Sequence, residues 1–304
     1  MYLSYSGFKK AITCLFSYWH EYPNKTPKTG PDDRLGSIYG SVVGKLFEDF
    51  YVQRVWLQPN PKEFLLGRVT QTVDAVIKQE TTTKGWKTGG ILLWKGSEPN
   101  QNPKGMYANR AELEADIRDT IPRGLDIIRQ YKLIGPRADA EYKLDFSTPE
   151  KHTLAGRADF IIQRVRPFSD LLIVDGKGSK HRGDYVDPQQ LVWYAMLFYL
   201  HSVSQGKPQL PNKLAFLYWR CNPDNAVDWL SVSEDDVKAL LATVLDTIRQ
   251  IEEKLKILPA GVSMDTVRGV FKPKANESNC RFCPYIAACP SGYKIQEELK
   301  CRQR

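Results

Sequence analysis

Residues 170–177 read DLLIVDGK, an apolar run that ends abruptly in a carboxylate and an ammonium. The run has the length and composition of a buried strand, and Gly176 after Asp175 is typical of a strand end. Because alternate residues of a strand point to the same side, Asp175 and Lys177 are expected to project together. A lone Asp-x-Lys triplet is most often a surface ion pair, so its meaning depends on the residues around it.

Two further β-type runs precede this strand, at residues 139–146 and 154–165. Turn-prone segments join the three runs, which predicts an antiparallel meander. Asp159 lies within the second run and Asp175 ends the third, so their carboxylates can converge on one hard cation. An ammonium beside such a carboxylate can position an attacking water or stabilise charge on phosphorus. The pattern therefore indicates phosphodiester cleavage.

An apolar segment, QQLVWYAMLFYL at residues 189–200, is predicted to be a helix that follows these strands. Gln190 and Tyr194 are four residues apart and share one face of it. Glutamine can touch both a water and a phosphate, and tyrosine can donate a hydrogen bond to a phosphate. Alone they are ordinary helix residues, but beside the Asp-x-Lys triplet they complete a candidate active site.

The rest of the chain is predicted to complete one domain over residues 1–304. We expect N-terminal helices in 1–57, an insertion or cap in 58–137, the catalytic core in 138–232, and a helix and tail in 233–304. Within these segments, 68–96 reads as a hairpin, 212–221 as a further core strand, and 233–257 as a long amphipathic helix capped by Ser233.

Net charge and cysteine content restrict the classes to which the protein can belong. The chain has 304 residues and a formal net charge of +8, which suits a polyanion such as nucleic acid as well as a mildly basic surface. No run approaches about 18 uninterrupted apolar residues, and the N-terminus lacks the apolar centre of a secretory signal. We therefore expect an intracellular protein, in which six cysteines favour metal ligation or spare thiols over disulfides.

Three successive motifs carry a family resemblance. GRAD at residues 156–159, VDGK at 174–177 and QLVWY at 190–194 resemble the motifs of RecB-type nucleases in the PD-(D/E)XK superfamily, with Asp in place of the commoner Glu before x-Lys. The resemblance implies an α/β, restriction-endonuclease-like core in which helices flank a mixed central sheet. It also implies Mg²⁺ or Mn²⁺ as the catalytic metal. It assigns the two metal-binding carboxylates to Asp159 and Asp175, and a further ligand carbonyl to Gly176. Lys177 corresponds to the residue that assists the attacking water. Gln190 and Tyr194 correspond to the two residues that line the site.

The resemblance extends to both ends of the chain. Residues 4–19, SYSGFKKAITCLFSYW, are similar to the opening helix of the iron-sulfur members, such as AddB-type helicase-nuclease subunits and CRISPR-adaptation nucleases. Those members carry one early and three late cysteines, and the matching residues here are Cys14, Cys280, Cys283 and Cys289. The resemblance therefore implies an iron-sulfur staple between the N-terminal helix and the C-terminal tail.

The spacing of these cysteines fits that assignment. Cys280 and Cys283 form a chelating C-x-x-C pair, and four thiolates suit a [4Fe-4S] cluster. A zinc ion accepts the same four ligands and remains the alternative. Of the other two cysteines, Cys221 is expected to be a buried small hydrophobe and Cys301 a bystander in a polar tail.

One position departs from the family pattern. The family commonly places a metal-binding His on an early helix in a G-x-x-x-H context, and here Gly44 stands where that His would fall. Glu48, one turn further on, is a tentative metal ligand or a solvated helix residue. Gly36, Gly40 and Gly44 form a small-residue stripe, read as structural because it would let a helix or backbone pack closely. Glu141 is a candidate to support the site from the first strand.

These features predict a Mg²⁺- or Mn²⁺-dependent DNA nuclease, an exonuclease acting on single-stranded DNA or DNA ends. Trp86, Trp94 and Tyr107 are candidates to stack on bases. The alternatives are a nuclease-derived DNA-binding subunit that has lost turnover with the helical His, and a zinc-stapled structural partner in a repair or phage complex. No G-x-x-x-x-G-K-S/T loop is present, so any unwinding would come from a helicase partner.

Overall fold

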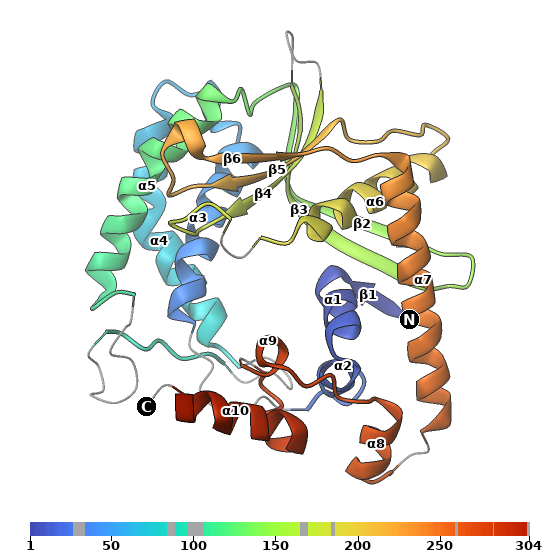
Figure 1. Cartoon of the computed structure of the whole chain (residues 1–304). Coiled ribbons are helices and arrows are strands. Elements are labelled where there is room, and N and C mark those ends of the chain that lie inside the picture. The colour runs from blue at the N-terminus through green and yellow to red at the C-terminus, as the bar shows by residue number, and fades with distance from the viewer. Residues whose placement is uncertain are drawn as a thin grey trace.

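The computed structural model describes residues 1–26, 34–83, 89–95, 106–164, 170–183, 186–258, 261–281 and 283–302. Its centre is a six-stranded mixed sheet in the order β1-β3-β4-β5-β6, with β2 paired to β3 (Figure 1). The strands are β1 (Tyr2–Ser4), β2 (Arg137–Ser147), β3 (Thr153–Gln163), β4 (Leu171–Lys177), β5 (Lys213–Tyr218) and β6 (Val227–Leu230).

Helices cover both faces of this sheet. The apolar core on one face lies under α3, α4 and α5, and that on the other lies under α1, α6 and α7 (Figure 1). Within the described ranges, no helix is long and apolar enough to cross a membrane. The helices and 3-10 turns are α1 (Tyr5–Thr13), α2 (Leu15–Glu21), α3 (Leu35–Val52), η1 (Val55–Leu57), α4 (Pro61–Thr81), α5 (Arg110–Gln130), α6 (Pro188–Ser204), η2 (Pro223–Asn225), α7 (Glu234–Ile257), α8 (Met264–Val270), α9 (Glu277–Cys280), η3 (Ile286–Ala288) and α10 (Pro290–Arg302).

The predicted meander is confirmed, because β2 pairs antiparallel with β3 and β3 pairs antiparallel with β4. The predicted strand at 212–221 is β5, which runs parallel to β4 after the crossover through α6. The chain therefore forms the predicted mixed sheet flanked by helices. The sequence reading did not include β1, a three-residue strand that pairs in parallel with β3. It was missed because it opens a segment that is otherwise helical.

The hairpin expected at 68–96 is wrong. Residues 68–81 of that stretch belong to α4, a helix of 21 residues with Pro61 in its first turn. Leu65, Val69, Val73 and Val76 are buried at helical spacing, so the apolar period of 3.6 prevails over the strand preference of valine. Residues 84–88 of the supposed hairpin lie outside the described ranges.

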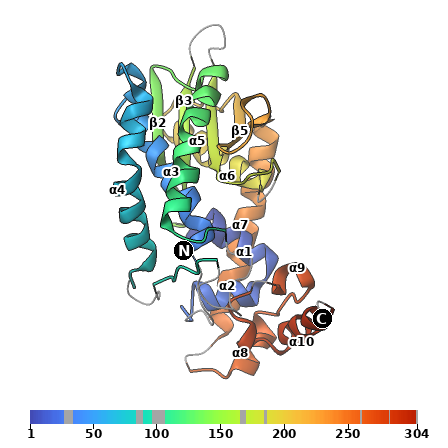
Figure 2. The same cartoon turned by 90° about the vertical axis from the view of Figure 1, so that its left-hand side faces the viewer.

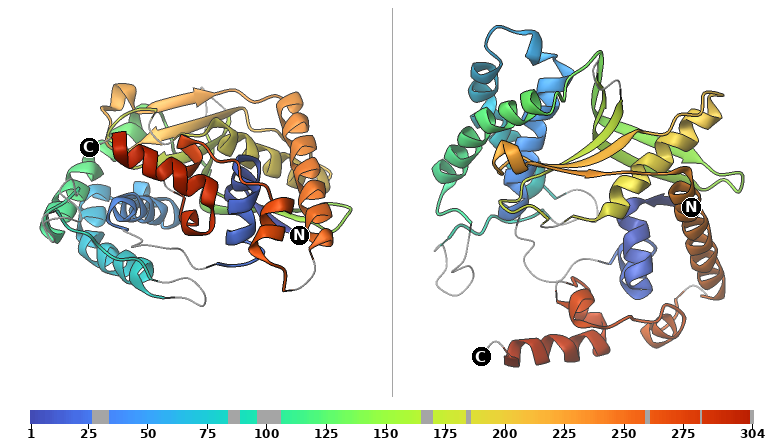
Figure 3. Two further views of the ribbon diagram at one scale, coloured as in Figure 1. Left: turned by 60° about the horizontal axis from the view of Figure 1, so that its bottom comes forward. Right: turned by 45° about the horizontal axis from the view of Figure 1, so that its top comes forward.

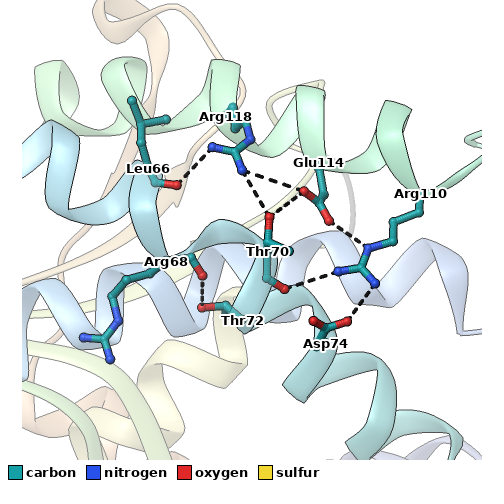
Figure 4. Close-up of polar contacts among 8 residues, drawn as sticks. All are labelled: Leu66, Arg68, Thr70, Thr72, Asp74, Arg110, Glu114 and Arg118. Carbon is teal, nitrogen blue, oxygen red and sulfur yellow. Dashed lines mark hydrogen bonds and ion pairs between the residues drawn. The ribbon is translucent and has the colours of Figure 1, made fainter.

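A polar ladder joins α4 to α5 (Figure 4). Arg118 donates to the carbonyl of Leu66 at 3.0 Å and to Thr70 Oγ1 at 3.2 Å. Arg110 contacts Glu114 at 2.7 Å, and Thr70 donates to the same carboxylate at 2.8 Å. Because the two arginine side chains are 41 % and 42 % exposed, these contacts orient the two helices more than they stabilise them.

The long helix predicted at 233–257 is confirmed as α7. Its start is a capping box, in which the N–H of Asp236 donates to Ser233 Oγ at 3.2 Å and Asp236 Oδ2 accepts from the Ser233 N–H at 2.8 Å. Val237, Val244 and Ile251 recur at intervals of seven and are buried against the sheet side of the helix. The amphipathic period therefore identified both the helix and its packing face.

The two ends of the chain lie side by side. Figures 2 and 3 show α1 and α2 next to the segment that carries α8, α9 and α10. Phe16 of α2 packs with Val267 and Phe271 in a small apolar cluster, and the Tyr285 hydroxyl donates to Glu21 at 3.0 Å. These contacts hold the C-terminal segment on the N-terminal helices.

Candidate active site

Asp159 and Asp175 lie where β3 and β4 diverge. The last residue pair between the two strands is Phe160 with Val174. Asp159 and Asp175 are the next residue on each strand beyond that pair. The two strands nevertheless remain tied, because the Gly176 N–H donates to Asp159 Oδ2 at 2.8 Å. The meander therefore brings the two predicted carboxylates to one place.

Lys177 lies beside Asp175, as the strand period predicts. Its Nζ is 2.5 Å from Asp175 Oδ2 and donates to Gln190 Oε1 at 3.3 Å. It also lies 5.2 Å from the centre of the Phe216 ring. Asp175 is only 3 % exposed, so this pair is a buried ion pair and not the surface salt bridge that an isolated triplet suggests.

Gln190 joins the strand residues to α6. Its Nε2 donates to Asp175 Oδ1 at 3.2 Å and to the Tyr194 hydroxyl at 2.9 Å. Gln190 and Tyr194 therefore share the helix face that their spacing predicts, and this face meets the end of β4. The start of α6 is fixed by Asp187, which accepts from the Gln189 N–H at 3.2 Å and pairs with Lys9 at 2.8 Å.

Close packing around Gly176 holds β4 in place. A Cβ atom at this position would lie 2.6 Å from Nε1 of Trp219, so only glycine fits between the two aspartates and the indole. Trp219 in turn stacks on Phe47 of α3, with ring centres 4.1 Å apart. The glycine of the VDGK motif is thus required by contact with the next strand.

The negative charges of Asp159 and Asp175 are not fully compensated by the positive charge near them. Burial and the neighbouring Asp175 carboxylate raise the pKa of Asp159 above its usual range. Burial also raises the pKa of Asp175, although Lys177 opposes this shift. A divalent cation would relieve the repulsion between the two groups, and carboxylates are the ligands that Mg²⁺ and Mn²⁺ prefer. The donor set therefore fits such an ion.

A cleft of about 510 Å³ opens beside Asp159 and Gly176. Gly44 of α3 lines it, and a Cβ atom placed at Gly44 would meet nothing within 4 Å. Glu48 lines the same cleft and forms an ion pair with Lys45 at 2.6 Å. The structure therefore places Glu48 in the lining of the same cleft as Asp159, where it is paired with Lys45.

The glycine stripe of α3 has two environments. A Cβ atom at Gly178 would lie 3.1 Å from Cα of Gly40, so a backbone packs closely there. An added Cβ at Gly36, Gly40 or Gly44 itself would meet nothing within 4 Å. Close backbone packing on the stripe is therefore seen only where Gly178 approaches the Cα of Gly40, and Gly44 leaves the cleft open.

Glu141 marks a switch in β2, the point where its side chains change from one face of the sheet to the other, and the sequence did not lead us to predict it. Ala138 and Ala140 pack on the α3 side of the sheet, whereas Tyr142 and Leu144 pack on the α6 side. The strict alternation of a strand is broken at Glu141, which has a left-handed φ of 50°. The irregular apolar pattern of residues 138–144 is the signal that could have revealed it.

The switch places an ion pair at the mouth of the cleft. Glu141 lies opposite Asp159 in the β2–β3 register, between the pairs Ala140–Phe160 and Tyr142–Ala158. Its carboxylate accepts from Arg157 Nη1 at 3.0 Å. Arg157 also lines the cleft, two residues before Asp159 on β3. Its position in the GRAD motif was the available signal for this second missed residue.

The four cysteines of the expected cluster line one cavity of about 450 Å³. Cys14 Sγ accepts from the Lys274 N–H at 3.4 Å, which joins the end of α1 to the C-terminal segment. Burial raises the pKa of Cys280 and of Cys283, and the neighbouring thiols raise each further. The cavity also reaches Gln190, so the cysteine site adjoins the candidate active site.

The remaining cysteines lie elsewhere. Cys221 is half-buried and its thiol donates to the Lys180 carbonyl at 3.8 Å, whereas Cys301 is exposed. The expected burial of Cys221 is therefore only partial. Over the ranges that the structure describes, no three His, Cys, Asp or Glu side chains are close enough together to hold a single metal ion.

The aromatic residues expected to stack on bases differ in their exposure. Tyr107 is 5 % exposed, and its hydroxyl donates to Asp116 at 2.7 Å. Trp94 is half-buried and packs against the core under α3 and α5. Trp86 lies outside the described residues. The prediction is wrong for Tyr107, which serves as a packing residue, and it stays a prediction for the half-buried Trp94.

Comparison with known families identifies the class of protein. The model of the PD-(D/E)XK nuclease superfamily matches residues 2–290, so the chain belongs to that superfamily over nearly its whole length. Members of this superfamily are generally nucleases, which typically use divalent metals, and the family implies DNA as the substrate. No curated protein matches the chain.

Two solved structures show a more distant likeness. A crystal structure of a putative exonuclease from Eubacterium rectale is 12% identical, with a TM-score of 0.46 over 91% of this chain and 85% of that one. The crystal structure of SSO0001 is 16% identical, with a TM-score of 0.31 over 60% of this chain and 78% of that one. Both scores are low, so the family assignment rests on the sequence match.

Proposed function

We propose that the protein is a Mg²⁺- or Mn²⁺-dependent deoxyribonuclease that hydrolyses phosphodiester bonds at the cleft beside Asp159. The observation that carries the proposal is the convergence of Asp159, Asp175, Lys177 and Gln190 from two strands and a helix onto one buried, electronegative site. We further propose that it acts as an exonuclease on single-stranded DNA or DNA ends, as the RecB-type resemblance implies.

Each residue has a distinct role in this proposal. Asp159 and Asp175 would hold the metal ion, with the Gly176 carbonyl as a further ligand. When bound, the ion would polarise the scissile phosphate and lower the pKa of a water molecule. Lys177, held at 2.5 Å from Asp175, would orient that water and stabilise negative charge on the phosphate oxygens.

The contacts of α6 support this arrangement. Gln190 bonds to Asp175, Lys177 and Tyr194 at once, so it fixes the carboxylate and the ammonium relative to each other. Tyr194 stays protonated at neutral pH, because burial raises its pKa. Its hydroxyl can therefore donate a hydrogen bond to a phosphate.

The competing function is a DNA-binding subunit without turnover. It is favoured by Gly44, which leaves the cleft without the histidine of the family pattern. Glu48 lines the same cleft and pairs with Lys45, and we propose it as a further metal ligand. In the active enzyme, Asp159 and Asp175 would supply the other carboxylates of the metal site.

We propose that Cys14, Cys280, Cys283 and Cys289 bind a [4Fe-4S] cluster. The proposal is supported by their common cavity, which is formed by segments from opposite ends of the chain. A zinc ion would need four sulfurs about 2.3 Å from one centre. Zinc accepts the same four ligands and remains the alternative occupant of this cavity. The cluster would staple 1–57 to 233–304 within a single RecB-like domain of AddB type.

A cleavage assay tests the function. Purified protein is incubated with end-labelled single-stranded and double-stranded DNA in Mn²⁺, Mg²⁺ or chelator. The proposal predicts shortening of the labelled strand in either metal and none in chelator. Binding without shortening in any metal would favour the inactive subunit. Any duplex unwinding would then fall to a helicase partner.

A further inference from the structure

We propose that a groove between α3 and β2 is the path by which a single DNA strand leaves the catalytic cleft, with Trp56 as the platform on which a base stacks. This inference rests on the proposed nuclease function. We call this region the α3–β2 groove. Its lining residues are Tyr51, Val52, Arg54, Trp56 and residues 136–143.

The groove adjoins the catalytic cleft at Glu141. It has a volume of about 700 Å³, and Glu141 lines both it and the cleft that contains Asp159. At its other end it shares Arg54, Trp56 and Pro136 with a smaller cavity of about 390 Å³. Figure 2 shows the elements that form its walls, α3 and β2, next to one another. An extended ligand can therefore run from Asp159 past Glu141 to Trp56.

The charge of the groove suits a phosphodiester backbone. Arg54 and Lys143 are exposed on opposite walls, and neither has an ion-pair partner among the described residues. Arg137 pairs with Asp139 at 2.8 Å and lies 5.7 Å from the centre of the Phe198 ring, on the α6 side of the sheet, and Glu141 pairs with Arg157. The groove itself therefore has an excess of positive charge, which attracts a polyanion.

The aromatic content of the groove suits an unpaired base. Trp56 is half-buried, and its ring is supported by Phe50 at 5.6 Å and Tyr51 at 5.8 Å between centres. Two tilted neighbours hold the indole in place while it still lines both cavities. A rigid, partly exposed ring beside basic side chains is the arrangement that binds single strands without sequence preference.

The switch in β2 lies where the groove meets the cleft. The side chains before and after Glu141 pack on opposite faces of the sheet. The outer edge of β2 is free of a second strand among the described elements. A strand of DNA can therefore follow this edge, and Glu141 with Arg157 lies at the junction with the cleft.

Binding in chelator tests the groove separately from cleavage. Fluorescence anisotropy of labelled oligo-dT of increasing length gives the affinity of wild-type protein, Trp56→Ala and Trp56→Phe. Loss of one base stack predicts about 5- to 150-fold weaker binding of long oligonucleotides by Trp56→Ala. The shortest oligonucleotides, which reach only the cleft, should bind as before, and Trp56→Phe should retain most of the affinity.

Charge variants test the same path. Arg54→Gln and Lys143→Gln should each reduce the slope of log affinity against log salt by about 0.7. Trp229→Ala, on the exposed ring of β6, and Arg129→Gln, on the outer surface of α5, are matched controls and should change neither property. If Trp56→Ala, Arg54→Gln and Lys143→Gln all bind long oligo-dT like wild type, the groove is not the path.

Cross-linking gives a readout that does not depend on a stable variant. Wild-type protein is irradiated with oligo-dT that carries one 5-iodouracil, and the attached peptide is identified by mass spectrometry. Attachment at Trp56 supports the inference, whereas attachment only elsewhere overturns it. If wild type binds through Trp56 but cleaves no DNA in any metal, the nuclease proposal fails and the groove stands. Equal dependence on Trp56 for duplex DNA would overturn the single-strand assignment.

Discussion

Nζ of Lys177 lies 2.5 Å from Oδ2 of Asp175, two residues earlier on the same strand. The two side chains share the side of β4 that faces α6, and Gln190 bonds to both. A candidate metal ligand is therefore paired with the only lysine in the three family motifs. Variants of the two residues can distinguish metal binding by Asp175 from stabilisation of the reacting phosphate by Lys177.

Replacement of Lys177 by alanine should lower the rate of cleavage and leave DNA binding largely unchanged. Removal of one preorganised donor from a reacting site costs about 10²- to 10³-fold in turnover. One phosphate contact is only a small part of a multi-contact binding footprint. Single-turnover cleavage and binding in chelator measure the two effects. Lys213→Ala, on the exposed start of β5, is the control, and an equal loss in both assays would make Lys177 a docking residue instead.

Asp159→Asn should stabilise the metal-free protein at neutral and alkaline pH. Burial and Asp175 raise the folded-state pKa of Asp159 above its unfolded value, so the folded state disfavours the charged carboxylate. This destabilisation is absent below the unfolded pKa of about 3.9 and grows as the pH rises through the folded pKa. Asparagine removes it, so the gain in Tm should be largest near pH 8 and vanish near about pH 4.

The same melting series provides a check on the metal site. Relief of each kcal/mol should raise Tm by roughly 2–4 °C in a chain of this size. Mn²⁺ should raise the Tm of wild-type protein and have little effect on Asp159→Asn, because the variant lacks a charged ligand. Two results would be inconsistent with uncompensated repulsion between Asp159 and Asp175. One is a lower Tm for Asp159→Asn than for wild type at pH 8, and the other is an equal rise in the Tm of both proteins in Mn²⁺.

Gly44→His should restore a metal ligand that the family pattern contains. The space beyond Gly44 is open, since an added Cβ meets nothing within 4 Å and the residue lines the cleft of Asp159. The variant should therefore fold and should need less Mn²⁺ for half-maximal cleavage. Gly36→His, on the same helix but outside the cleft lining, is the control. The companion Glu48→Gln should leave the metal dependence unchanged unless Glu48 is a ligand.

Cys14→Ser, Cys280→Ser, Cys283→Ser and Cys289→Ser should each remove the brown colour of anaerobically purified protein. Each should also lower its Tm, because a cluster between Cys14 and the C-terminal segment closes nearly the whole chain into a loop. Cys301→Ser is the control, since that residue is exposed. Iron and acid-labile sulfide are measured together. Stoichiometric zinc without sulfide would replace the cluster by a zinc site and leave the nuclease proposal intact.

Local sequence patterns predicted the elements that carry the candidate site. Short β-type runs identified β2, β3 and β4, and an interval of four placed Gln190 and Tyr194 on one face of α6. Such patterns report each residue's immediate neighbours along the chain, and the motif residues lie within a few positions of a strand end or helix start. Their convergence followed from strand pairing alone.

The features that were missed depend on contacts between distant segments. The switch at Glu141 arises because β2 packs against α3 before it and against α6 after it. The helix α4 was misread because its valines satisfy a strand preference and a helical period, and only packing on α3 and α5 selects the latter. The open space at Gly44 likewise depends on what faces it across the cleft.

The central claim is that Asp159 and Asp175 hold a divalent cation that drives hydrolysis of DNA. The most direct measurement is the single-turnover cleavage rate of labelled single-stranded DNA as a function of Mn²⁺ concentration, for wild type and Asp175→Ala. We predict a saturable rise for wild type, no cleavage in chelator, and no detectable rate for Asp175→Ala at any Mn²⁺ concentration, with DNA binding retained. Cleavage by Asp175→Ala at the wild-type rate, or cleavage by wild type in chelator, would contradict the account.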